Sequence, residues 1–406
     1  MTSVHCLVHW RHVVAIASWT VLIGEVLHAA SPAADRTADK TADFLLREHL
    51  GRDWRHERVT FPLDARLLRR AKGGDELLAA DGRSIPYQWM PAEGEAEPRI
   101  AFQVDLPSYG ELRLSFANRP APAMTSDLRV EETPAGITVV NSRIGVRLRR
   151  QLATGEGPIA GVRLDSGQWT AGSRFIDSRS TVSKSELTVK ARGPVCVVVE
   201  SRHQFADGGE WRLEFRIESG EPVIVVNEYF DVPGGGRFSL PLGGEQFRPT
   251  HMFHRNADVT NIGVMSDPIA GYQLEPWLRW SNPRHGTWVA LHSPPRAGDA
   301  PSTPDMLVAA MLNPSLWVDP QWKGKAAQPA PAALVQVRDG LGHLDFTLGG
   351  GRRAWLLGAI RQDESVALLG KANKRVAPPP QHLVLKHGDF PLDKVKDFVL
   401  DWTAVE

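Results

Sequence analysis

Short runs of apolar residues, many alternating with polar ones, recur along this chain at intervals of about ten residues and are separated by turn-forming residues. The segment Trp211-Arg-Leu-Glu-Phe-Arg-Ile217 shows the alternation most clearly. A period of two is typical of a β-strand with one buried and one solvated face. Strands at this spacing, with Gly and Pro between them, predict antiparallel sandwiches or barrels rather than a parallel sheet with crossover helices. The expected strands are Arg58–Phe61, Ile85–Trp89, Ile100–Val104, Glu111–Phe116, Gly136–Val140, Ile144–Arg149, Glu186–Val189, Val195–Arg202, Glu210–Ile217, Val223–Asp231, Trp288–His292, Met306–Leu312, Leu334–Val337, Leu344–Leu348 and Ala354–Ile360.

The predicted fold class is all-β, with an antiparallel small β-barrel or sandwich over residues 54–118 and a large β-sandwich over residues 127–375. The segment Asn118–Ser126, rich in Pro and Ala, separates the two. Residues 376–406 are expected to form a stiff proline linker and a C-terminal helix, because successive prolines favour an extended conformation. Short terminal helices are expected at Thr41–Leu50, Asp363–Lys374 and Leu392–Trp402.

The first thirty residues have the order of a secretory signal peptide. His9, Arg11 and His12 precede an apolar run from Val13 to Leu27, and small residues follow it. The run is about fifteen residues long, which is shorter than the roughly 20 needed to span a bilayer. We therefore expect residues 1–30 to be removed, and the mature protein to be exported to the periplasm or the extracellular space without a membrane anchor. The alternative is an uncleaved anchor.

The chain carries 47 Lys plus Arg against 47 Asp plus Glu, so its formal net charge is zero. A nucleic-acid partner is not expected, because such proteins usually carry a basic patch. Of the 2 cysteines, Cys6 lies in the predicted signal peptide, which leaves Cys196 alone in the mature chain. Cys196 lies in the β-branched run Pro194-Val-Cys-Val-Val-Val-Glu200, so we expect it to act as a small buried hydrophobe.

Residues with the chemistry of a polysaccharide lyase gather in Arg248-Pro-Thr-His-Met-Phe-His-Arg-Asn256. Such an enzyme needs cations to neutralise a uronate carboxylate and a base to remove a proton. The candidate catalytic residues are His251, His254, Arg255 and Tyr272. A glycoside hydrolase would need two carboxylates instead, and Glu228 with Asp231 are the nearest pair. The alternative is that this segment is a solvated loop. No third ligand completes a metal site with His251 and His254, so no metal or cofactor is expected.

Three tryptophans, Trp277, Trp280 and Trp288, fall within a short irregular stretch beside Arg279 and His285. Exposed aromatic faces on loops can stack on the apolar faces of sugar rings, so these five residues are the candidate substrate-binding set. The alternative is that the indoles fill the space between two sheets, because large aromatic side chains are mostly buried.

The chain also resembles a known group of proteins. The residues that carry the resemblance in the first unit are Trp54 to Leu63, Asp81-Gly-Arg-Ser-Ile-Pro-Tyr-Gln88 and Ile100-Ala-Phe-Gln-Val-Asp-Leu-Pro107. They look like the N-terminal β domain of large secreted bacterial polysaccharide-degrading proteins. In the second unit the residues are Gly136 to Val146, Gly193-Pro-Val195, Trp211 to Ile217 and Gly220 to Glu228. They resemble the large β-sandwich of those proteins and of α-mannosidase and mutarotase-like enzymes.

In the exo-acting rhamnogalacturonan lyase-like and heparinase-like families, this β region accompanies a helical toroid. The present sequence shows no long helical region after Pro380, so it departs from that pattern and is either a stand-alone β protein or a fragment of a longer one. The resemblance implies a carbohydrate-associated protein that binds or positions a polysaccharide within a polysaccharide-degrading system, with an acidic polysaccharide as a candidate. The alternatives are a polysaccharide lyase or glycoside hydrolase with a site near 248–256, and a structural spacer.

Overall fold

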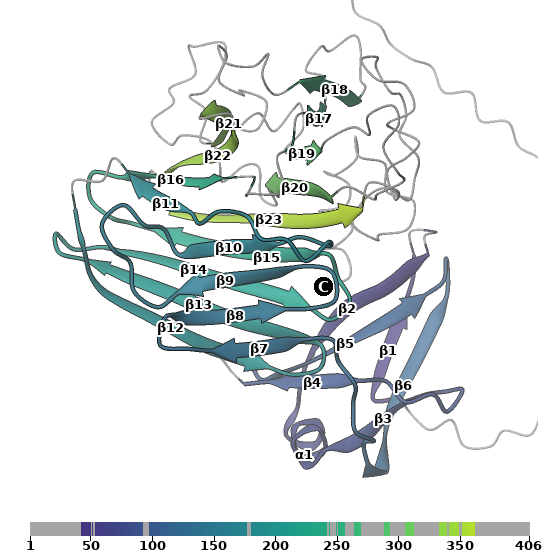
Figure 1. The fold of residues 1–406 in the computed structure, drawn as a ribbon. Coiled ribbons are helices and arrows are strands. Elements are labelled where there is room, and N and C mark those ends of the chain that lie inside the picture. Colours follow the sequence, from purple (N-terminus) through teal and green to yellow (C-terminus); the bar gives the residue numbers. More distant parts are fainter. Residues whose placement is uncertain are drawn as a thin grey trace, which may run out of the picture. The chain divides into compact units, whose positions relative to one another are not determined.

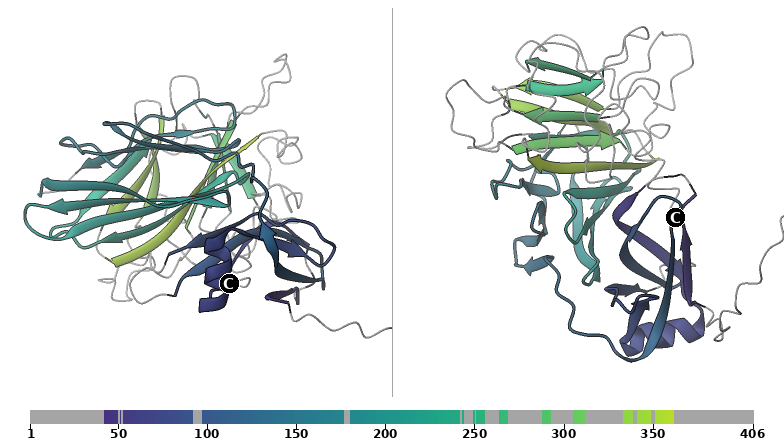
Figure 2. Two further views of the ribbon diagram at one scale, coloured as in Figure 1. Left: turned by 90° about the horizontal axis from the view of Figure 1, so that it is seen from below. Right: turned by 90° about the vertical axis from the view of Figure 1, so that its right-hand side faces the viewer.

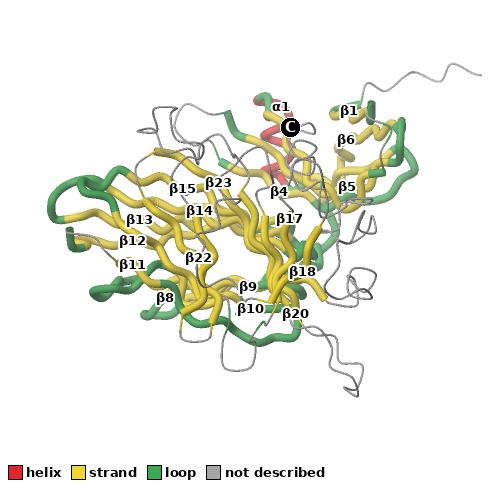
Figure 3. The backbone as a smooth tube through the Cα atoms, turned by 90° about the horizontal axis from the view of Figure 1, so that it is seen from above, coloured by secondary structure: helices red, strands yellow, loops and turns green. Residues whose placement is uncertain are grey.

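The computed structural model describes residues 42–241 apart from 50, 52, 92–96 and 177–179, then residues 243 and 249 and the strand residues 251–255, 264–268, 288–292, 305–311, 333–338, 341–348 and 351–361. Within this part, all neighbouring strands pair antiparallel, and α1 (Ala65–Gly73) is the one helix (Figures 1 and 3). The prediction of an all-β, antiparallel fold is confirmed, and none of the described sheets closes into a barrel.

Two three-stranded sheets and α1 make up the N-terminal β region, residues 44–120. Their elements are β1 (Phe44–Arg47), β6 (Glu111–Pro120) and β3 (Asp75–Ala79) in one sheet, and β2 (Trp54–Pro62), β5 (Arg99–Leu106) and β4 (Tyr87–Met90) in the other. Aromatic side chains from both sheets meet in one core. The ring of Phe44 lies 5.8 Å from that of Phe102 and 6.0 Å from that of Phe116.

Helix α1 was not predicted from the sequence, and the helix predicted at Thr41–Leu50 is wrong. The Asp64 side chain caps α1 by accepting a hydrogen bond from the Leu67 backbone N–H at 2.7 Å, and Gly74 ends it in the left-handed conformation. Residues Phe44–Arg47 form β1 instead, with Phe44 and Leu46 buried and their neighbours exposed. Pairing with β6 overrides the local helix preference of this segment.

The remaining strands form the sandwich region, residues 129–361. Its largest sheet has nine strands in the order β12 (Val182–Arg192), β13 (Cys196–Phe205), β14 (Glu210–Glu218), β15 (Val223–Phe230), β23 (Gly351–Arg361), β20 (Asp305–Met311), β19 (Trp288–His292), β17 (His251–Arg255) and β18 (Val264–Pro268). A four-stranded sheet has β10 (Ile159–Arg163), β9 (Gly145–Arg149), β8 (Gly136–Val140) and β7 (Arg129–Glu132). Another has β11 (Arg174–Ile176), β16 (Gly236–Pro241), β22 (Leu341–Leu348) and β21 (Ala333–Arg338).

One apolar core joins these three sheets. Buried side chains from the nine-stranded sheet, such as Phe215, pack in the same cluster as Val146 of β9 and Leu344 of β22. Trp211 of β14 lies at its centre, with its ring 5.7 Å from that of Phe238. Figure 2 shows the blue strands β7–β10 as a layer beside the teal strands β12–β15. The alternating pattern that predicted β14 therefore corresponds to one face buried in this core.

At the edge of the nine-stranded sheet, β12 departs from regular pairing. Its register with β13 shifts between Val182 and Lys184 and again between Val189 and Ala191, which marks two bulges or irregularities. Apart from Leu187, its side chains are exposed or half-buried.

The N-terminal β region contacts the sandwich region at the turn between β14 and β15, Glu218–Glu221. Arg58 of β2 forms an ion pair with Glu218 at 2.8 Å, and both side chains are buried. Gln103 of β5 donates a hydrogen bond to the Ser219 carbonyl at 3.0 Å. These contacts bind β2 and β5 to the sandwich region.

Several predictions fall outside the described residues. They are the signal peptide, the helices at Asp363–Lys374 and Leu392–Trp402 and the linker and helix at 376–406. The domain boundaries at 118 and 127 stay predictions. No helix in the described part of the chain is long and apolar enough to cross a membrane.

Candidate functional site

A groove of about 760 Å³ opens where the N-terminal β region meets the sandwich region. We call it the junction groove. Its lining comes from α1 and the glycine that follows it, β4, the segment between β6 and β7, β7 itself, the end of β12, the β12–β13 turn and β13. The lining residues are Ala71, Gly74, Tyr87, Gln88, Trp89, Ala121, Met124, Ser126, Leu128, Arg129, Val130, Arg192, Gly193, Pro194 and Val197.

Trp89 provides an accessible aromatic surface in this groove. It lies near the end of β4 and is 38 % exposed, whereas the two preceding residues of the strand are buried. The ammonium of Lys72, on α1, lies 5.0 Å from the centre of its ring. An indole in contact with solvent offers an apolar face for stacking and an N–H for hydrogen bonding.

The charged side chains that line the groove are both cationic. Arg129 is exposed, and no described residue forms a hydrogen bond or ion pair with its guanidinium. Arg192 donates to the Val130 carbonyl at 3.2 Å and lies 3.9 Å from Glu132. No Asp or Glu is among the lining residues, so the groove favours an anionic ligand over a cationic one.

Gln88 is buried, yet it lines the groove. Its Oε1 accepts a hydrogen bond from the backbone N–H of Cys196 at 3.0 Å. Gly193 packs so closely against it that a Cβ there would lie 2.3 Å from Gln88 Cδ. The absence of a side chain at Gly193 is therefore what lets Gln88 occupy this position.

The groove walls are tied together by hydrogen bonds. The Tyr87 hydroxyl lies 2.8 Å from the Asp75 carbonyl of β3 and 3.2 Å from the Ala71 carbonyl of α1, which holds β4 beside both elements, and burial raises the pKa of this phenol to about 12. On the opposite wall, the Ser126 hydroxyl donates to the Pro194 carbonyl at 3.0 Å. These hydrogen bonds link the segments that line the groove.

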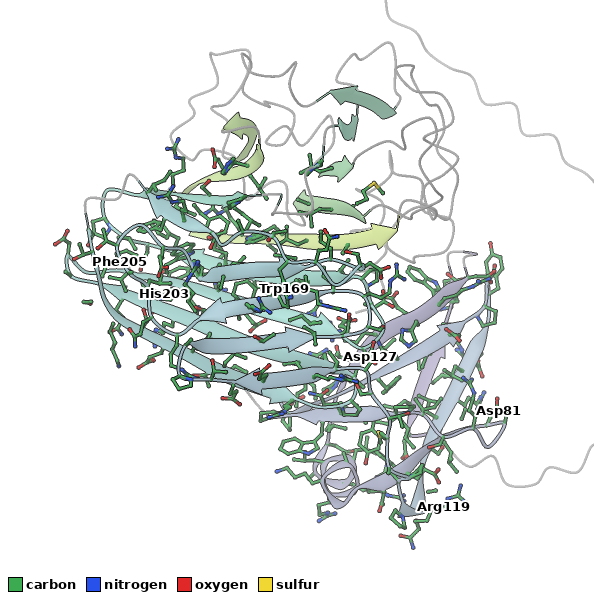
Figure 4. All side chains as sticks on the ribbon, viewed as in Figure 1. Asp81, Arg119, Asp127, Trp169, His203 and Phe205 are labelled. Carbon is green, nitrogen blue, oxygen red and sulfur yellow. The ribbon has the colours of Figure 1, made fainter. Side chains whose placement is uncertain are left out.

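Asp127 anchors the segment between β6 and β7 to the sandwich region (Figure 4). Its carboxylate accepts hydrogen bonds from the N–H and hydroxyl of Ser142, the hydroxyl of Ser219 and the N–H of Gly220, at 2.6 to 3.2 Å. Burial alone would raise the pKa of Asp127, but these hydrogen bonds outweigh burial and lower it.

The structure places part of the sequence-predicted site on strands. His251, His254 and Arg255 belong to β17, which pairs with β18 and β19, so the alternative reading of this segment as a solvated loop is wrong. Trp288 is the first residue of β19. Tyr272, Trp277, Arg279, Trp280 and His285 lie outside the described residues, and the catalytic and substrate-binding roles of all nine stay predictions.

Cys196 is fully buried, as predicted. Burial, with a smaller contribution from Glu218, raises the pKa of its thiol to about 11. Among the described residues, no group of three or more His, Cys, Asp and Glu side chains is close enough to hold a metal ion.

The junction groove could not be found from the sequence, because Trp89, Arg129 and Arg192 lie far apart in the chain. One local feature pointed to it. The expected strand Ile85–Trp89 ends on a large aromatic residue that is followed by Met-Pro-Ala and a run of acidic and small residues, so Trp89 is unlike an interior strand residue.

No protein-family model and no curated protein matches the chain. Similarity to solved structures exists at 10–12 % sequence identity. A protein in the glycosyl hydrolase family 38 from Enterococcus faecalis gives a TM-score of 0.42, over 80 % of this chain and 45 % of that one. An α-mannosidase from Enterococcus faecalis V583 gives a TM-score of 0.42, over 80 % of this chain and 43 % of that one. The α-galactosidase AgaA of Geobacillus stearothermophilus, described as a GH36 enzyme, gives a TM-score of 0.30. The match covers 59 % of this chain and 40 % of that one. The chain thus spans less than half the length of each.

Proposed function

We propose that this protein binds an acidic polysaccharide in the junction groove and serves as an accessory part of a polysaccharide-degrading system. The observation that carries the proposal is the lining of the groove, where the exposed indole of Trp89 and the cations Arg129 and Arg192 occur without any carboxylate. Indoles stack on sugar rings, and guanidinium groups bind carboxylates in a planar, two-pronged geometry. The resemblance found in the sequence points to the same class of ligand.

Export is part of this proposal, because a polysaccharide of this kind is met outside the cytoplasm. It rests on the basic, apolar and small-residue order of residues 9–31. Catalysis at 251–255, by lyase or hydrolase chemistry, is the alternative function.

The test is affinity electrophoresis and calorimetry of the full chain with polygalacturonate as the acidic polymer and dextran as the neutral one. The parent should bind polygalacturonate, with an affinity that falls as salt is added, because salt screens exposed charges. Trp89→Ala should weaken binding by about 10-fold, equivalent to about 1.4 kcal/mol. Tyr109→Ala is the matched control, since Tyr109 is 76 % exposed and lies outside the groove.

Two results would contradict the proposal. The first is binding that Trp89→Ala and Tyr109→Ala leave equally intact. The second is release of unsaturated sugars or new reducing ends by the parent, with loss of that turnover in His251→Ala or His254→Ala, which would establish the catalytic alternative.

A further inference from the structure

We infer that Gln88 is a ligand-binding residue of the junction groove, and that its side-chain Nε2 donates hydrogen bonds to an acceptor oxygen of the bound sugar. This inference rests on the proposed function and adds to it a specific donor that neither charge nor stacking supplies.

The first step concerns the orientation of the amide. Of the two ends of a side-chain amide only the oxygen accepts, so the hydrogen bond from Cys196 N–H identifies Oε1 and fixes which end carries the NH₂ group. The close approach of Gly193 leaves no room for the side chain to move toward the β12–β13 turn. The NH₂ group is therefore held in one place.

The second step concerns its partners. Only 6 % of Gln88 is exposed, and the residue lines the groove. Within the described part of the chain, Nε2 has no hydrogen-bond acceptor, whereas Oε1 has its donor. An amide NH₂ group that lines a groove and has no protein acceptor can donate to a ligand or to water there.

The third step concerns the ligand. An NH₂ group donates only, so the matching ligand atom is an acceptor, such as a carboxylate, hydroxyl or ring oxygen of a sugar. Trp89 is the next residue of β4 and Arg129 lines the same groove. Because all three residues line one groove, a bound polysaccharide can contact the amide, the indole and the guanidinium. A site built to donate to a ligand oxygen discriminates strongly against analogues that lack it.

The test compares Gln88→Glu with the parent in calorimetric titrations with polygalacturonate. A glutamate keeps an oxygen for Cys196 N–H and replaces the donor with an acceptor, so binding should weaken by at least about 10-fold. Gln168→Glu makes the same chemical change outside the groove and should bind as the parent does. Arg129→Gln changes the net charge by the same amount. The loss of affinity in Arg129→Gln should shrink as salt is added, whereas the loss of affinity in Gln88→Glu should persist.

A second readout needs no folded variant. In the parent labelled with ¹⁵N at glutamine, the side-chain NH₂ resonances of Gln88 should shift on titration with polygalacturonate, while those of Gln168 should stay in place. Failure of the parent to bind any polysaccharide would overturn both this inference and the proposed function. Parental binding with unshifted Gln88 resonances, or with an affinity that Gln88→Glu leaves unchanged, would overturn this inference alone.

Discussion

Acidification should destabilise this protein through His203, a fully buried residue of β13. Its Nε2 lies 2.8 Å from the Ser201 hydroxyl and its Nδ1 lies 2.9 Å from the Ser185 hydroxyl, so both ring nitrogens have partners. Figure 4 shows it near Phe205, toward one end of the large sheet. Burial disfavours the charged imidazolium and lowers the pKa of His203 from 6.5 to about 4.

The sign of the effect follows from this lowered pKa. Below pH 6.5 the unfolded chain takes up a proton at this position, whereas the folded protein does so only near pH 4. The contribution of neutral His203 to the free energy of unfolding is therefore fully present above pH 6.5 and is lost as the pH falls toward 4. One pKa unit corresponds to about 1.4 kcal/mol, so the loss over this interval is roughly 3 kcal/mol.

The measurement is urea unfolding of the parent and of His203→Gln between pH 8 and pH 4, followed by tryptophan fluorescence. Glutamine can bond to the two serines but does not titrate, so the variant should lack the His203 contribution to the pH dependence. The difference in unfolding free energy between the two proteins should be constant above about pH 7 and should change by roughly 3 kcal/mol toward pH 4. A difference that stays constant over the whole range would refute the argument that His203 is buried and neutral.

Two further predictions concern the buried groups near the β14–β15 turn. Arg58→Met leaves the buried carboxylate of Glu218 with one cation fewer and should destabilise the protein by about 3 kcal/mol, while the double variant with Glu218→Met should recover much of that loss in thermal unfolding. Native Cys196 should react with a thiol reagent only as fast as the protein unfolds, since its thiol is buried and protonated, and rapid native labelling would show that it is accessible.

Much of the strand pattern was predictable because it depends on local alternation. The strands expected at Gly136–Val140 and Trp288–His292 have the same bounds in the structure. In contrast, β1 has only four residues, and its alternation of Phe44 and Leu46 with exposed neighbours was hidden among residues that favour a helix. Helix α1 was missed although its two ends, Asp64 and Gly74, have the residue types that cap helices.

The junction groove could not be predicted, because none of its properties is local. Gln88 becomes a ligand-binding candidate only when β13 brings the Cys196 N–H to its Oε1. Likewise, Arg129 and Arg192 line one groove only because β7 and the β12–β13 turn both lie beside β4. No single window of sequence contains this tertiary arrangement.

The irregular edge strand β12 has a consequence for how this protein behaves when concentrated. An unpaired strand edge is a template on which another chain can add a strand, which is the first step of β-aggregation. Lys184 and Lys190 lie on β12, and its two shifts in register disturb the even row of backbone groups that an added strand would need. A further chain would have to match a distorted edge that carries these lysines, so this edge of the large sheet is a poor template for edge-to-edge polymerisation.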